Sequence, residues 1–506
     1  MTQLVVICVY LLALLAIGWL STRLFEGTAR DYFLASHSIG PVMLLMSIFG
    51  TTMTAFALVG ATGESYRLGI GVLGMLASWS ALVHTAVFFF VGIKLWSIGK
   101  RLGYLTQIQY FRDRFESDAI GLLLFPALVG LVIPYLLTGL LGAGSVVVVV
   151  TQGALPDLFP ATGGGIPAWL TNLVISAVVL AYISLGGLRG AAWANTFQTI
   201  VFLLTGITAT VLIAAKLGGA QAATQAVLAA HPERLIVGGA VQPLEFLAYG
   251  LIPLSVGTFP HVFQHWLTAR SAKAFKLTVV GHPLFIALLW TPCVLIGVWA
   301  TSAVMPDGSL VVPLEHPPNS ELGLMVQKLT TPIIGGLLGA GILAAIMSSL
   351  DSQFLAISSI FTNDIVGHYV SQERIDDRQR VRLGRLFVVV IVGLTFGLSL
   401  LEPRSVFALG VWCFSGFTAL FPLVVAALYW KRTTRAGAIA SIVSATVVWF
   451  VLFRDSNYAA DPGYEFLGLM PVVTMTFAAI VALVGVSLVT TPPSAATIEK
   501  FFPAKP

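Results

Sequence analysis

Long apolar segments separated by short polar ones dominate the pattern along the chain. Several of the apolar segments hold no Asp, Glu, Lys or Arg: 32–63, 119–156, 190–215, 277–306 and 405–430. Each is longer than the roughly 20 residues that a helix needs to cross a bilayer. Run length and turn residues together predict about thirteen transmembrane helices, at about 3–20, 41–63, 70–98, 119–150, 166–185, 190–216, 244–268, 277–304, 331–364, 386–401, 405–430, 436–453 and 468–490. The pattern therefore predicts an all-α polytopic membrane protein.

The polar segments between these helices predict the topology. The longest are about 217–243, 305–330 and 365–385, too short for a soluble domain, so we expect one membrane domain over 1–506. An odd number of helices places the two termini on opposite sides. With the N-terminus outside, 21 of the 27 Lys and Arg residues lie on the inner side, as the positive-inside rule requires. We therefore expect a multi-pass protein of the cell (inner) membrane with a cytoplasmic C-terminus.

Composition narrows the class of protein further. Hydrophobic residues make up 57% of the chain and charged residues 10%, whereas a soluble domain carries roughly 25% charge. This excludes a cytosolic enzyme, a nucleic-acid-binding protein and a disordered chain. Cys8, Cys293 and Cys413 all lie in apolar segments, so we expect free thiols and no disulfide framework.

Two predicted helices carry residues that interrupt a helix near the middle of the bilayer. The second reads SIFGTTMTAFALVGATG (47–63) and the seventh reads LIPLSVGTFPHVFQHW (251–266). Gly50-Thr51-Thr52 and Gly257 to Pro260 weaken helical structure, and carbonyls freed in hydrocarbon need protein, water or an ion. Broken helices at matching positions of two halves indicate the binding site of a transporter. The alternative is a pair of kinks that only shape helix packing.

The ninth helix carries a cluster of hydroxyls and one carboxylate. Ser348 and Ser352 share a face at i, i+4, with Ser349 and Asp351 beside them. A carboxylate inside the membrane is costly unless it faces a cavity, a partner or an ion. Na⁺ is a hard cation that prefers oxygen ligands, and these hydroxyls can supply them. The alternative is that the serines bond to carbonyls one turn earlier or join neighbouring helices.

Five motifs in order carry a resemblance to a known family. They are DYFLASHSIGP (31–41), LTQIQYFRDRF (105–115), YISLGGLRGAAWANTFQ (182–198), FPHVFQHWLTARSAKAFK (259–276) and AAIMSSLDSQFLAISSIFTNDI (344–365). In these motifs the chain resembles the sodium:solute symporter family. The resemblance implies the leucine-transporter-type fold, with two inverted five-helix repeats over 41–216 and 244–430 and broken first and sixth core helices. One helix (3–20) would precede the repeats and two (436–490) would follow.

The resemblance also implies a sodium site. Na⁺ would be bound by the carbonyls of Gly50, Met53 and Ala345 and by the hydroxyls of Ser348 and Ser349. The chain departs from the family where Asn195 stands in place of a usual Asp, so we expect no second sodium there. We assign Asn195 and Asp351 to coupling or gating. His261 and His265, at i, i+4, are expected to be packing or hydrogen-bonding groups and not a metal site.

Residues on the broken helices suggest the class of substrate. Sugar-transporting relatives have amides where this chain has Ala57 and Ile252, which argues against a sugar, because buried hydroxyls would lack partners. The predicted cavity lining is Thr52, Thr54, Phe56, Ala57, Leu254, Ser255, Thr258, Trp412, Cys413 and Phe414. Backbone amides at half-helix ends suit an anionic group, so a small carboxylate or an amino acid is favoured.

The sequence thus predicts Na⁺-coupled symport of a small organic solute by alternating access, with Na⁺ as the co-transported ion. It predicts the lipid bilayer and a small-molecule substrate as partners. It predicts no enzyme activity, no nucleic-acid partner and no obligate protein partner. A proton-coupled or sugar symporter of the same fold, with Asp351 as a proton carrier, is one alternative. A transporter-like nutrient sensor is another.

Overall fold

The computed structural model describes residues 1–21, 39–369, 377–401 and 404–503. Most of the motif 31–41 therefore lies outside the described residues. In the described part the protein is built from helices, and its only extended pairings are isolated bridges. The long helices are α1 (Thr2–Ser21), α9 (Asp118–Val150), α10 (Ala168–Lys216), α14 (Phe275–Ala300), α16 (Pro332–Ile360), α18 (Asp377–Ser399), α19 (Val406–Tyr429), α20 (Arg435–Asp455) and α21 (Pro471–Val489).

The predicted all-α membrane fold is confirmed, whereas the count of thirteen helices is not. Among the described residues, ten helices are long and apolar enough to cross a membrane, or twelve with the two bent pairs. Another apolar helix, Ala168–Ser184, is shorter than this length. It forms the first part of α10, which is kinked at Gly187, where φ is 55°. A positive φ is readily adopted only by glycine, so Gly187 allows α10 to kink at this one residue and to continue as a helix on both sides of it.

One span is made of short helical pieces in succession. It runs over Gly71–Leu102 and consists of α5 (Gly71–Leu73), η4 (Gly74–Ser78), α6 (Trp79–Val87), η5 (Phe88–Gly92) and α7 (Ile93–Leu102). The η4 and η5 pieces have π-helical hydrogen bonding, which is common near functional sites.

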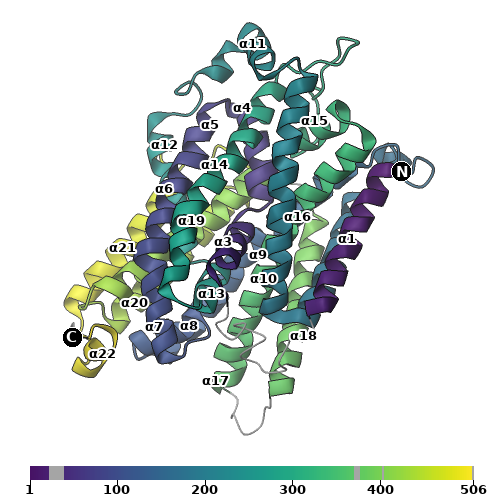
Figure 1. Ribbon diagram of the computed structural model, residues 1–506. Coiled ribbons are helices and arrows are strands. Elements are labelled where there is room, and N and C mark those ends of the chain that lie inside the picture. The colour runs from purple at the N-terminus through teal and green to yellow at the C-terminus, as the bar shows by residue number, and fades with distance from the viewer. Residues whose placement is uncertain (22–38, 370–376, 402–403, 504–506) are drawn as a thin grey trace.

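Two helices form the centre of the bundle. In the most apolar 18-residue stretch of each helix, 83% of the residues are buried in α16 and 78% in α19, against 22% in α1. A helix that is apolar all round is a buried helix, so these two are core elements and α1 lies at the edge (Figure 1). α16 packs on α10, α9, α1 and α3 (Pro41–Thr52).

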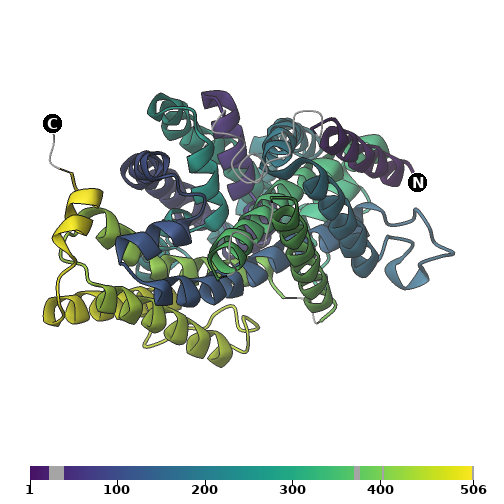
Figure 2. The same cartoon turned by 90° about the horizontal axis from the view of Figure 1, so that it is seen from below.

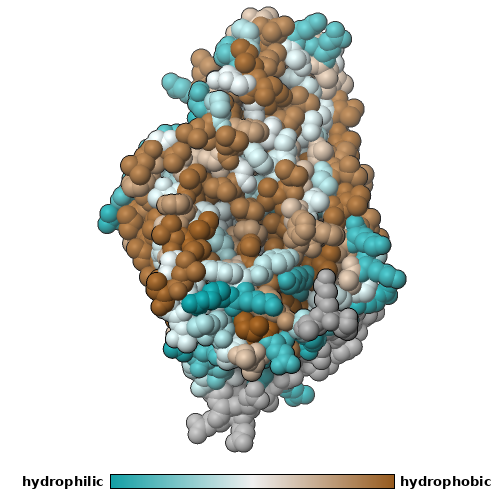
Figure 3. All heavy atoms as spheres, turned by 90° about the vertical axis from the view of Figure 1, so that its left-hand side faces the viewer, coloured by the Kyte–Doolittle hydropathy of each residue, from teal (hydrophilic) through white to brown (hydrophobic). Residues whose placement is uncertain are grey.

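The surface and the termini fit a membrane-spanning bundle. On the face that Figure 3 shows, hydrophobic side chains cover much of the middle and upper part, and hydrophilic ones are densest toward the lower end. α1 runs along one side of the bundle with the N-terminus at its upper end, and the C-terminal helix α22 (Ala495–Phe501) lies low on the opposite side, as Figure 1 shows. One end of the bundle is formed by α22, α8 (Gln107–Arg114) and the start of α18. We call it the basic end, because the sequence analysis places most Lys and Arg residues on this side, which it predicts to face the cytoplasm.

Candidate functional site

Both predicted interruptions exist: the first lies just after Gly50-Thr51-Thr52, and the second falls within the predicted stretch Gly257 to Pro260. The first lies between α3 and the pair η3 (Phe56–Gly60) and α4 (Ala61–Leu68), with a bend of 62°. The backbone is extended at Met53, with φ −92° and ψ 107°, so its carbonyl leaves the helical pattern. Gly50, expected to weaken the helix, instead lies inside α3.

The second interruption separates α12 (Pro243–Tyr249) and η8 (Ile252–Gly257) from α13 (Pro260–Thr268), with a bend of 51°. Phe259 has φ −59° and ψ 121°, and Pro260 then begins α13, where its missing N–H is not needed. The two broken helices therefore present free backbone groups at mid-length.

Three of the predicted sodium ligands converge where α3 contacts α16. The Ser348 hydroxyl donates to the Gly50 carbonyl at 2.5 Å and lies 3.3 Å from the Ala345 carbonyl. The Ser349 hydroxyl donates to the Ile346 carbonyl on its own helix at 3.0 Å. This agrees with the alternative that these serines bond to carbonyls one turn earlier. Met53 is buried one turn after Gly50, and its side chain borders the cavity described below.

Asp351 lies in a fully buried polar network on the next turn of α16. Its carboxylate accepts from Tyr182 at 3.0 Å and from Ser352 at 3.1 Å. With its amide nitrogen toward Asp351, Asn195 donates to both carboxylate oxygens at 3.2 Å. His265 Nε2 lies 3.2 Å from the Ser352 hydroxyl. Among the residues that the structure describes, Asp351 has neutral hydrogen-bond donors and no cationic partner.

A small cavity of about 30 Å³ lies between the two broken helices. Its walls include four of the predicted substrate residues, Thr52, Phe56, Ser255 and Phe414. Met53, a predicted sodium ligand, and Ile252, compared above with an amide of sugar-transporting relatives, also line the cavity. The sequence did not identify the remaining lining residues, which are Ser80, His84, Tyr135, Tyr249, Pro253, Phe259 and Trp290. His84 and Tyr135 are polar groups inside apolar segments, which was the only available signal for them.

Other predicted substrate residues lie away from this cavity. Thr54 Oγ1 accepts from the Phe56 amide at 3.0 Å, so it caps the second half of the broken helix. The Thr258 hydroxyl donates to Ser255 and Phe417 carbonyls, both at 2.8 Å. Ala57, Leu254 and Cys413 do not border the cavity, and Trp412 borders an outer pocket instead.

Several polar groups in the cavity wall have no hydrogen-bond partner among the residues that the structure describes. They are Tyr135 Oη, His84 Nδ1 and Trp290 Nε1, each buried. A buried polar group without a partner is costly, so these groups favour a polar occupant. Within the described part of the chain, the residues that line the cavity include no Asp, Glu, Lys or Arg.

Stacked aromatic rings separate the cavity from the outer pocket. The Phe407 ring stacks on Phe56 at 4.9 Å and on Tyr249 at 6.4 Å between centroids. Tyr249 borders both spaces. The outer pocket, about 90 Å³, is lined by Glu64 and Arg67, which form an ion pair, among other residues.

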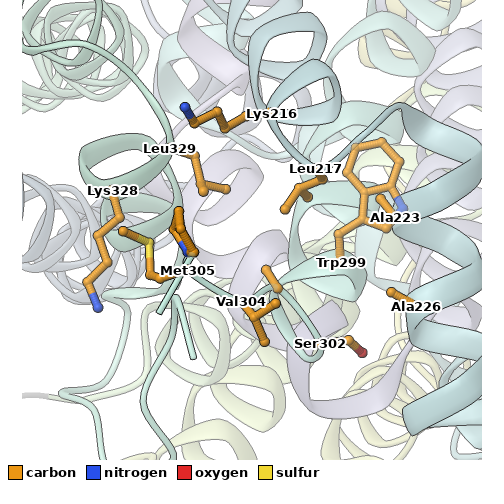
Figure 4. Close-up of a pocket in the computed structure, with 12 residues that line it drawn as sticks. Lys216, Leu217, Ala223, Ala226, Trp299, Ser302, Val304, Met305, Lys328 and Leu329 are labelled. Carbon is orange, nitrogen blue, oxygen red and sulfur yellow. The ribbon is translucent and has the colours of Figure 1, made fainter. Parts of the chain in front are cut away.

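A larger cavity, about 510 Å³, lies far from the broken helices, beside the last turns of α10 and α14. Figure 4 shows Trp299 and Met305 on opposite sides of it, with Lys216 and Lys328 at its edges. Neither the serines of α16 nor the broken helices reach it, so size alone does not identify the site.

Comparison with known proteins decides the family. The sodium:solute symporter family matches residues 32–444. The chain belongs to the sodium:solute symporter family. It is 26% identical to the sodium/proline symporters of Staphylococcus aureus strains JH9 and NCTC 8325, with 97% of this chain and 93% of each relative covered.

Solved structures show the same fold. A Na⁺-coupled sialic acid symporter in a substrate-bound, outward-open state superposes with a TM-score of 0.78 at 19% identity, covering 98% of this chain and 99% of that one. A transporter of the nucleobase-cation-symport-1 family gives 0.54 at 12% identity, covering 93% and 97%. The leucine-transporter-type fold is thus confirmed, as are Na⁺-coupled symport of a small organic solute and Na⁺ as the co-transported ion.

Proposed function

We propose that this protein imports a small amino acid or a similar small carboxylate together with Na⁺ across the cell membrane. The N-terminus would face outward and the basic end the cytoplasm. The observation that carries the proposal is the hydrogen bond from the Ser348 hydroxyl to the Gly50 carbonyl, which lies in the last turn of α3 before the interruption.

The proposed sodium site consists of the carbonyls of Gly50, Met53 and Ala345 and the hydroxyls of Ser348 and Ser349. All are neutral oxygens, as suits a hard monovalent cation. The Ser348 contacts to Gly50 and Ala345 support this set, because both carbonyls lie within hydrogen-bond distance of the Ser348 hydroxyl. The extended backbone at Met53 supports it too, since a carbonyl outside a helix is free to bind an ion.

The proposed substrate site is the cavity between the broken helices. The absence of Asp, Glu, Lys and Arg from its walls suits a compact solute whose carboxylate is met by helix-end amides. Tyr135, His84 and Trp290 supply additional polar contacts from three other helices. The relatives named sodium/proline symporters support an amino acid over a sugar. At about 30 Å³ the cavity is contracted, so substrate binding requires the aromatic stack to open.

The proposed mechanism is alternating access between two inverted repeats, about 41–216 and 244–430. Na⁺ would hold α3 against α16 while the site faces outward. Closing the stack of Phe56, Phe407 and Tyr249 over the substrate would precede opening at the basic end, where α3 leaves α16 and the sodium ligands separate. An inside-negative potential contributes roughly 2.3 kcal/mol per charge per 100 mV. Asp351 and Asn195 would keep α16 fixed to α10 during this change.

Uptake into proteoliposomes tests the proposal. We expect accumulation of radiolabelled proline or another small amino acid under a Na⁺ gradient, and none when choline replaces Na⁺ at fixed pH. Uptake that persists in choline would overturn Na⁺ coupling and favour protons. A sugar that competes better than any amino acid or carboxylate would overturn the substrate class.

The serines provide a matched mutational test. Ser348→Ala with Ser349→Ala should raise the Na⁺ concentration for half-maximal uptake at least tenfold. Ser358→Ala with Ser359→Ala alters an equally buried pair on the same helix and should leave it unchanged. Equal effects of the two pairs would show that α16 is merely destabilised and that the proposed ligands are wrong.

A further inference from the structure

The C-terminal helix α22 is docked on α8 at the basic end by charged, polar and aromatic contacts. Lys500 Nζ lies 2.6 Å from the Asp113 carboxylate. Glu116 accepts from Ser494 at 2.7 Å and also from Thr497. Phe501 is buried, with its ring 5.9 Å from that of Tyr110 on α8. The seven-residue helix α22 is thus held by contacts near both of its ends.

The same segment also reaches α7, so it connects two elements. Arg101 Nη2 donates to the Lys500 carbonyl at 2.6 Å. Lys94 Nζ lies 5.9 Å from the Phe502 ring. Figure 2, which looks at this end, shows the yellow C-terminal segment at the edge of the bundle beside the blue helices of this region.

α7 in turn holds the point where the two broken helices meet at the basic end. Ile39, before α3, pairs with the segment after α13: its amide donates to Thr268 at 3.2 Å, and its carbonyl accepts from Arg270 at 3.0 Å. We call these two bonds the inner bridge. Trp96 Nε1 on α7 donates to the Ala269 carbonyl at 2.8 Å and Lys100 donates to Arg270 at 3.2 Å.

On its other side α8 holds η10 (Phe361–Val366), the π-helical segment that continues α16. The Thr106 hydroxyl, at the start of α8, donates to the buried Asp364 carboxylate at 2.6 Å. Arg112 Nη1 lies 3.6 Å from the other Asp364 oxygen. Opening at the basic end requires the inner bridge to part, and α22 spans the two elements, α7 and α8, that stabilise the closed arrangement.

We propose that α22 is a reversible latch that stabilises the conformation closed at the basic end. The proposal rests on the alternating access proposed above. The Lys500–Asp113 pair is partly exposed, with 41% and 35% of the two side chains accessible, and such pairs are individually weak. Such a pair on a short helix at the edge of the bundle shifts a conformational population by a modest amount. Its release raises the fraction of molecules that open toward the basic end.

Thiol labelling at the inner bridge tests the latch. Ala269 is fully buried, so Ala269→Cys, in a chain whose native Cys8, Cys293 and Cys413 are replaced by Ala, reacts only when the bridge opens. The reporter is labelled with a maleimide in the purified full-length protein, with Na⁺ or with K⁺. Lys500→Glu should raise the labelling rate at least threefold, and Asp113→Lys added to it should restore the slow rate.

The control is the neighbouring Glu499, which is exposed. Glu499→Ala should label as slowly as the reporter alone. Labelling of Lys500→Glu at the reporter's rate, labelling of Glu499→Ala as fast as Lys500→Glu, or a charge-swapped pair that stays fast would each overturn the latch. Slower labelling of the reporter in Na⁺ than in K⁺ is expected from the proposed function. Its absence would overturn the Na⁺-dependent closure, separately from the latch.

Discussion

Gly50 is the position where one added methyl group tests the sodium site most directly. A Cβ there would lie 2.5 Å from Thr199 Oγ1, 3.3 Å from Ser348 Oγ and 3.4 Å from the Asn195 carbonyl. The Thr199 hydroxyl donates to Met46 at 3.0 Å, so turning it aside breaks a hydrogen bond. α3 therefore approaches α10 and α16 too closely for any residue but glycine.

The size of the effect follows from opposing terms. Overpacking of this kind costs about 1–3 kcal/mol, and the lost hydrogen bond about 0.5–1.5 kcal/mol. The higher helix propensity of alanine returns up to about 1 kcal/mol. With the middle of each range and the full alanine term, the net cost for Gly50→Ala is about 2 kcal/mol, borne by the state in which α3 contacts α16. If Na⁺ binds that state, its half-saturating concentration rises about 30-fold.

The measurement is the Na⁺ dependence of initial uptake rates in proteoliposomes. Gly130→Ala is the control, because a Cβ there meets nothing within 4 Å. Thr199→Ala removes the atom of closest approach, so the double variant Gly50→Ala/Thr199→Ala should recover most of the Na⁺ affinity. An unchanged Na⁺ dependence in Gly50→Ala, or a double variant no better than the single one, would refute the reasoning.

Two further predictions concern buried carboxylates. Asn195→Asp places a second carboxylate beside Asp351, and two like charges this close are unfavourable. Uptake by this variant should therefore fall at least tenfold and should recover in the double variant Asn195→Asp/Asp351→Asn. Full uptake by the single variant would contradict this, and a gain in the number of Na⁺ ions transported per substrate would indicate an additional cation there. Burial raises the pKa of Glu321, outside the spans, above its ordinary value of 4.5. The folded protein then binds this proton more tightly than the unfolded chain, so the contribution to stability is full below about pH 4.5 and is lost as pH rises through the raised pKa. Glu321→Gln should therefore raise the melting temperature at about pH 8 and hardly at all at about pH 4, and an equal shift at both would count against the sign.

The broken helices were predictable because their cause is local. Pro260 removes an amide donor, and small or hydroxylated residues surround both interruptions, so the sequence alone marks the segments. The exact position of the first interruption was not predictable, whereas the second lies within the predicted stretch Gly257 to Pro260. Gly50 serves close approach to Thr199 and does not break the helix, while the extended residue, Met53, has no unusual propensity of its own.

The substrate lining was less predictable because it depends on which helix faces meet. Ser80, His84, Tyr135 and Trp290 come from α6, α9 and α14. Helices buried on most sides show no amphipathic stripe, so periodicity does not tell which face borders a cavity. The same reason explains Thr258, whose hydroxyl was expected in the cavity but satisfies carbonyls of η8 and α19.

The i, i+4 hydroxyls of α16 connect this helix to both broken helices. Ser348 contacts Gly50 on α3, and Ser352 lies within hydrogen-bond distance of His265 on α13. Between them, Asp351 joins α16 to α10 through Tyr182. Because each contact leads to a different element, loss of one hydroxyl should loosen one broken helix and spare the other. Loss of the carboxylate should instead shift α16 itself, and with it both contacts at once.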